Sequence, residues 1–116
     1  VEGPNFVQYH KFLGKIYEET FDAVDDIAEQ IRQLEAYAPT GKEQLDELTT
    51  IKIDNTIPSA ITMFSNLKAD NELVMVSILE AYNTAESEMK IGLSNFLQDR
   101  MMAHSKLDWM LKSITK

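Results

Sequence analysis

Apolar residues recur every three or four positions along the first part of the chain, which is the spacing of one face of an α-helix. The pattern runs from Phe6 to Leu34 without a proline, and Gly3-Pro4-Asn5 precedes it as a helix start signal. We therefore predict one helix of about 30 residues and about 45 Å. Its apolar positions are Phe6, Tyr9, Leu13, Ile16, Tyr17, Phe21, Val24, Ile27, Ala28, Ile31 and Leu34.

Residues 36–58 interrupt this pattern with prolines, a glycine and an asparagine. Within them, Thr40 and Glu43 have the spacing of a capping box, which predicts a short helix from Lys42 to Leu48. The whole connection is long enough to travel the length of a helical bundle.

A second long apolar pattern predicts one continuous helix from about Ser59 to Glu86. The polar pair Asp70-Asn71 is a possible break in it, but the continuous helix is favoured. Gly92 marks a boundary, after which a last helix is expected. Because the 87–91 connection is short, the last two helices should be antiparallel neighbours.

Three long helices and one long connection predict an all-α, ferritin-like four-helix bundle with a long crossover that carries the short helix. The first helix of such a bundle is lacking here and would lie upstream of Val1. We therefore expect residues 1–116 to form a single, N-terminally incomplete domain.

Composition narrows the possible functions. The 116 residues contain 19 Asp and Glu against 11 Lys and Arg, a net charge of −8 that disfavours nucleic-acid binding and favours cations as ligands. The chain has 0 Cys, which excludes disulfides, thiolate metal sites and cysteine nucleophiles and fits a reducing compartment. We see no signal peptide and no membrane span, and expect a cytoplasmic protein.

An acidic stripe follows the first predicted helix. Glu18, Asp22, Asp25 and Glu29 fall within about 60° of one another at 100° per residue. One interpretation is a solvated helix face, which the nearby residues Lys11, Lys15 and Arg32 favour. The other is a hard-cation site, because carboxylates four residues apart can converge on one ion.

His10 lies at the edge of the apolar face of the same helix. Taken alone, a histidine there is more often partly buried and hydrogen-bonded than a ligand. It precedes Asp25 by about 22 Å of helix, so one copy cannot use both residues for one metal. In two antiparallel copies with a two-fold axis near residue 18, His10 of one copy lies level with Asp25 and Glu29 of the other.

Three stretches of this helix resemble the Dps family of ferritin-like mini-ferritins: Val1-Glu2-Gly3-Pro4-Asn5-Phe6, then Tyr9-His10, then Asp25-Asp26-Ile27-Ala28-Glu29. The C-terminal end matches the family too, at Asp99-Arg100, Ala103-His104, Lys106, Trp109-Met110-Leu111 and Ser113.

The resemblance implies a hollow dodecameric shell that binds ferrous iron across a dimer two-fold axis. Such proteins oxidise the iron, preferentially with hydrogen peroxide, and store the ferric mineral inside. By position, His10 matches an iron ligand of one subunit, and Asp25 and Glu29 match the ligands of its partner.

The chain departs from the family pattern at the site. The family's first histidine would lie three residues before Val1, and the usual aspartate four residues after the next histidine is Gly14 here. Asp22 lies at the right level to approach Gly14 across the two-fold axis and is our candidate substitute ligand.

A second departure lies near the last helix, where the family places acidic residues along an iron-entry pore. Here that stretch holds Lys90, Ile91 and Asn95, with only Glu86 and Glu88 acidic nearby.

Some family members bind DNA through a lysine-rich tail. Lys106, Lys112 and Lys116 are interleaved with apolar residues and are typical of a helix C-terminus, so we do not expect this chain to bind DNA. His104 and the large side chains of the last two helices are interpreted as packing residues. The latter are Trp109, Met63, Met75, Met101, Met102 and Met110.

The leading hypothesis is iron binding, ferroxidase-type oxidation and storage. The alternative is a structural or interaction oligomer of the same fold that has lost ferroxidase activity.

Three amphipathic helices leave an apolar face that needs a fourth helix, a partner subunit or both. We therefore predict an obligate oligomer with a two-fold dimer as its site-forming unit. Analytical ultracentrifugation should show no monomer at micromolar concentration. A single monomeric species there would contradict the prediction.

Overall fold

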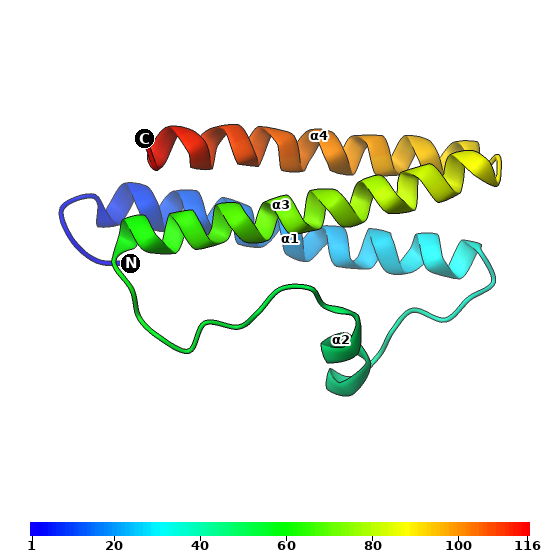
Figure 1. The fold of residues 1–116 in the computed structure, drawn as a ribbon, viewed down its shortest axis with the longest axis horizontal. Helices are drawn as coiled ribbons and strands as arrows, with labels where there is room; N and C mark the ends of the chain where they lie inside the picture. The colour runs from blue at the N-terminus through cyan, green and yellow to red at the C-terminus, as the bar shows by residue number, and fades with distance from the viewer. The chain divides into compact units, whose positions relative to one another are not determined.

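The computed structural model describes residues 1–116 and contains only α-helices, as predicted (Figure 1). It divides into two compact units, Val1–Lys52 and Ile53–Lys116. No helix is long and apolar enough to cross a membrane. The helices are α1 (Phe6–Gln33), α2 (Lys42–Leu48), α3 (Ala60–Ser87) and α4 (Ile91–Ile114).

The first unit is built on α1, whose 28 residues run without a break through Gly14. The helix ends where Glu35 adopts a left-handed conformation with φ of 62°. The Ala36 amide then donates to the Ile31 carbonyl at 3.4 Å, which is a common way to satisfy the last carbonyls of a helix. Arg32 reinforces this end, because its Nη1 donates to the Ala36 carbonyl at 2.7 Å.

The short helix α2 has the predicted bounds, but the predicted capping box does not form. Gly41, not Thr40, is the N-cap residue, and no side chain caps this end. Instead, the Thr40 amide donates to Oε1 of Gln44 at 2.8 Å. The capping-box spacing counts from the residue directly before the helix, and here a glycine with φ of 81° occupies that place.

The second unit is an antiparallel hairpin of α3 and α4, as the short connection predicted (Figure 1). Ser59 caps α3, since its Oγ accepts a hydrogen bond from the Thr62 amide. The helix is continuous through Asp70 and Asn71, as favoured. Phe64 near the start of α3 and Leu111 near the end of α4 are completely buried.

The turn of the hairpin lies within the predicted 87–91 connection, at residues 88–90. The chain reverses at Met89, which has φ of 57°, and the Lys90 amide donates to the Ala85 carbonyl at 2.9 Å. Gly92 is the second residue of α4 and not its boundary. Its backbone has no positive φ, so the turn does not use the freedom of glycine.

Met89 offers a test of this turn. Its side chain is 81% exposed and its backbone is in the region that favours glycine. We expect Met89→Gly to raise the free energy of unfolding by about 0.5–1 kcal/mol. Urea denaturation measures this change. Lys90→Gly, at a position of negative φ, should instead destabilise the chain, and a loss of stability in Met89→Gly would contradict our account of the turn.

Candidate functional site

The candidate metal ligands lie along α1. His10, Asp22, Asp25 and Glu29 are all exposed, which corrects the expectation of a partly buried His10. Within the chain, no three His, Asp or Glu side chains come together to hold a metal ion. This agrees with the separation of about 22 Å between the levels of His10 and Asp25 on one helix.

The candidate carboxylates have no partners within the chain. Neither an ion pair nor a side-chain hydrogen bond engages Asp22, Asp25 or Glu29. Nearby, Arg32 is directed elsewhere, with its guanidinium 4.6 Å from the centre of the Tyr37 ring. The carboxylate oxygens are therefore available to a cation.

His10 is also available. Its ring stacks on Phe6, with centroids 5.3 Å apart and planes at 20°. Stacking fixes the face of the imidazole and leaves its edge nitrogens open.

An exposed apolar stripe borders these residues. Tyr17, Phe21 and Val24 are 68%, 65% and 61% exposed, and at 100° per residue they share a sector of about 60° with His10 and Ala28. Tyr17 and Phe21 stack on each other with centroids 6.0 Å apart. Large apolar side chains gathered on one exposed face are typical of a protein interface.

Gly14 lies on α1 one turn after His10, next to this stripe. A Cβ atom added there would meet no other atom within 4 Å. No close packing in this chain explains the glycine, and a side chain would fit.

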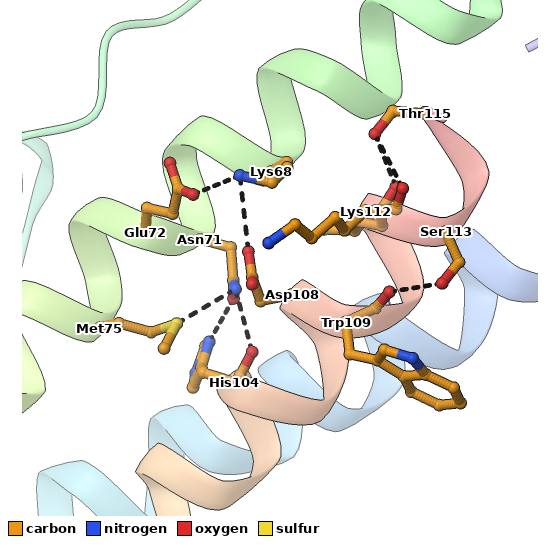
Figure 2. A network of polar contacts seen from close by, with 11 residues as sticks. Lys68, Asn71, Glu72, Met75, His104, Asp108, Trp109, Lys112, Ser113 and Thr115 are labelled. Atoms are coloured by element: carbon orange, nitrogen blue, oxygen red, sulfur yellow. Dashed lines mark hydrogen bonds and ion pairs between the residues drawn. The ribbon is translucent and has the colours of Figure 1, made fainter.

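A second polar cluster lies between α3 and α4 (Figure 2). Asn71 and His104 are 4% and 8% exposed. Nδ2 of Asn71 donates to the His104 carbonyl at 3.0 Å, and its Oδ1 lies 2.7 Å from Nδ1 of His104. The expected structural role of His104 is consistent with this pairing. From the sequence, Asn71 was considered only as a possible helix break. A polar residue on the apolar face of a helix can also indicate a buried hydrogen bond to a polar residue such as histidine on a neighbouring helix.

Lys68 extends the cluster, and no motif or spacing around it marks it as a functional residue. Its ammonium pairs with Glu72, and its Nζ lies 3.8 Å from Oδ1 of Asp108 on α4 (Figure 2). The hydrogen bond to Glu72 is the main cause that raises the pKa of Lys68, with Asp108 adding to it. Oδ1 of Asp108 is buried without a hydrogen bond, so Lys68 is its electrostatic compensation.

The hairpin also carries an apolar cavity of about 340 Å³, where Tyr82 accepts a hydrogen bond from Gln98 at 3.4 Å. The cavity is lined by Ile78, Leu79, Tyr82, Leu97, Gln98, Met101 and Met102.

The large side chains that were expected to have packing roles differ in their burial. The expectation is wrong within this chain for Trp109 and Met102, which are 64% and 71% exposed. The other four methionines, Met63, Met75, Met101 and Met110, are half-buried.

The helix order and the long crossover define a ferritin-like protein, and the comparison with family models agrees. The ferritin-like domain model matches residues 1–116, so the chain belongs to that family. Among curated proteins it is similar to a low temperature-induced protein of Nostoc sp., uncharacterized, with 31% identity over 115 residues. The alignment covers 97% of this chain and 64% of that protein, so the chain spans about two thirds of the relative's length.

Solved structures of Dps proteins share the fold. Dps from Staphylococcus aureus is 26% identical with a TM-score of 0.90, over 99% of this chain and 77% of that one. The Dps protein of Vibrio cholerae, described as a member of a broad superfamily of ferritin-like diiron-carboxylate proteins, is 21% identical with a TM-score of 0.94. That match covers 100% of this chain and 73% of the other. The resemblance to the Dps family is thus confirmed at the level of the fold.

The buried pair between α3 and α4 should be important for stability. Asn71→Ala removes the amide that contacts Nδ1 and the carbonyl of His104, so we expect a loss of about 2–3 kcal/mol in the free energy of unfolding. Chemical denaturation measures this loss. The exposed residue Asn83 on α3 provides a matched control, and Asn83→Ala should change stability by less than about 0.5 kcal/mol. Equal effects of the two variants would contradict the role assigned to Asn71.

Proposed function

We propose that the chain binds ferrous iron, oxidises it with hydrogen peroxide as the expected oxidant, and stores the ferric product. The observation that carries this proposal is the set of unpaired ligands on α1, in a chain of the ferritin-like family. Removing ferrous iron and peroxide together limits hydroxyl-radical formation and would protect the cell against oxidative stress.

The site would be shared by two copies of α1. In an antiparallel pair with a two-fold axis near residue 18, His10 of one copy lies level with Asp25 and Glu29 of the other, at about 1.5 Å per residue. Two equivalent sites then form, one on each side of the axis. The arrangement brings together ligands that a single helix holds too far apart.

The exposed apolar stripe of α1 supports this pairing. Tyr17 and Phe21 lie close to the level of the axis, so the same face that brings the ligands together would bury these rings. Burial of apolar area stabilises such a dimer at roughly 25 cal/mol per Å² of apolar surface. A dodecameric shell built from these dimers is what the Dps resemblance implies.

The ligand chemistry suits iron. His10 offers a neutral nitrogen, and Asp25 and Glu29 offer hard anionic oxygens, a mixture that binds Fe²⁺. Zinc could occupy the same ligands, because affinity alone does not separate these metals. Three protein ligands leave coordination positions for the oxidant, and two Fe²⁺ ions supply the two electrons that reduce one peroxide, with two protons, to two waters.

Gly14 removes one carboxylate that the family pattern supplies. Asp22 of the partner copy would lie level with Gly14, is exposed and has no partner in the chain. We propose it as the substitute ligand. Gly14→Asp fits the free space beside this glycine and should tighten iron binding if the site lies there.

The alternative function is a structural or interaction oligomer without ferroxidase activity, and Gly14 is the observation that favours it. Such a protein would keep the α1 pairing and lose saturable iron binding. The two functions therefore make opposite predictions for the same titration.

Anaerobic titration with Fe²⁺ by calorimetry tests the proposal. The wild-type chain should bind iron saturably and then develop ferric absorbance rapidly on addition of peroxide. The double variant Asp25→Ala/Glu29→Ala should lose at least about 100-fold in affinity, because it removes both anionic ligands.

The matched control is Glu43→Ala/Glu47→Ala on α2, which removes the same charge from exposed positions of the first unit. This control should bind iron like the wild type. Retained stoichiometric binding in the Asp25/Glu29 variant would overturn the site. Absence of saturable binding in the wild type, with the oligomer intact, would support the structural alternative.

A further inference from the structure

The charges of α1 are divided between its two halves. Residues 6–17 carry Lys11 and Lys15 and no acidic side chain, whereas residues 18–33 carry all the acidic side chains of the helix and only Arg32 as a basic one. These acidic residues are Glu18, Glu19, Asp22, Asp25, Asp26 and Glu29. The first half of the helix is therefore positive and the second half strongly negative.

Lys11 and Lys15 lie on the same side of α1 as the candidate carboxylates. At 100° per residue, the two lysines share with Asp22 and Asp25 a sector of about 80°, which borders the exposed apolar stripe. All four side chains are exposed, and no ion pair engages either lysine within the chain. The ammonium groups are therefore available to a partner outside the chain.

In the antiparallel pair, halves of opposite charge lie side by side. With the two-fold axis near residue 18, Lys11 of one copy lies level with Asp25 of the other. Lys15 lies within about 1.5 Å of the level of Asp22 of the other copy. An axis perpendicular to the helices also keeps the shared sector of both copies on one side of the pair. A parallel pair would instead bring positive half beside positive half and negative beside negative, which is repulsive.

We propose that Lys11 and Lys15 are the counter-cations of the shared site: in the metal-free pair their ammonium groups bind Asp25 and Asp22 of the other copy, orient the two helices antiparallel, and leave when a divalent metal enters. This role, which rests on the α1 pairing of the proposed function, suits lysine. Its ammonium lies at the end of a flexible four-carbon chain and can withdraw into water while the helix stays in place. In the metal-free pair the ammonium groups offset the repulsion between neighbouring carboxylates.

Association of the full chain in metal-free buffer tests the pairing. Sedimentation velocity in the presence of a chelator, over a dilution series, measures the dissociation constant. It should rise about tenfold in Lys11→Gln/Lys15→Gln, because two exposed ion pairs are lost at each of two sites and each contributes about a factor of two. Added salt should weaken the wild-type pair more than the pair of this variant, because salt screens exposed ion pairs.

The matched control is Lys52→Gln/Lys116→Gln, which removes the same charge from exposed positions outside α1. This control should associate like the wild type. An unchanged dissociation constant in the Lys11/Lys15 variant, or a wild-type chain that stays monomeric, would overturn the proposal.

Charge reversal tests the antiparallel orientation. Lys11→Asp/Lys15→Asp sets acidic side chains against Asp22 and Asp25 of the other copy, so it should weaken association more than the glutamine variant. Adding Asp22→Lys/Asp25→Lys to the same chain restores opposite charges at each level of an antiparallel pair, and association should recover. In a parallel pair, like charges would stay together in all three chains. Failure of the fourfold variant to recover would contradict the orienting role of the lysines.

Iron binding separates this proposal from the proposed function. Fe²⁺ is titrated anaerobically by calorimetry, at a protein concentration at which the wild type and Lys11→Gln/Lys15→Gln are both paired. The variant should bind Fe²⁺ about tenfold more tightly, because no ammonium has to be displaced from the carboxylates. Equal affinities would overturn the counter-cation role and leave the iron site standing. Lysine-dependent association in a chain without saturable Fe²⁺ binding would reject the proposed function and confirm the orienting role.

Discussion

An α-helix advances about 1.5 Å per residue, and this fixed rise determines which side chains of the protein can reach one another. On α1 it places His10 and the Asp25–Glu29 pair at levels about 22 Å apart, too far for one ion. A second copy running the opposite way is the simplest means of bringing them level. In the dimer that we propose, the stacked aromatic rings of Tyr17 and Phe21 would be covered by that copy.

The same rise per residue determines which residues of α3 and α4 lie at the same level along the hairpin. Because the helices are antiparallel, each polar residue on one helix needs a partner at one particular level of the other. Asn71 meets His104, and three residues earlier Lys68 meets Asp108. A slip of one turn would break both contacts between Asn71 and His104, and a buried polar group that loses its hydrogen bond costs about 1–3 kcal/mol. These polar contacts therefore specify the register that the apolar residues Phe64 and Leu111 stabilise.

The two units divide the physical roles. In the first, carboxylates and an imidazole are exposed and unpaired. Exposure to water carries no desolvation cost for these groups and leaves them free to bind a cation. In the second, polar groups are buried and paired, which contributes specificity. The ferritin-like family explains the order of the helices, whereas Gly14 is a property of this chain that bears on the metal site we propose.

Local sequence patterns were sufficient to predict the helices and to select the candidate site residues. Helical periodicity predicted α1, α2 and α3 to within about one residue at each end, because apolar spacing and caps are local signals. It assigned the N-cap of α2 to Thr40 instead of Gly41, and it missed the left-handed conformation of Met89, which has no local signature because the residue is not glycine. The separation of His10 from Asp25 also followed from residue numbers alone. The pairing of Asn71 with His104 and of Lys68 with Asp108 could not be predicted in this way, because it depends on the packing of α3 against α4. Those contacts join residues more than thirty positions apart, and their partners depend on how two helices meet.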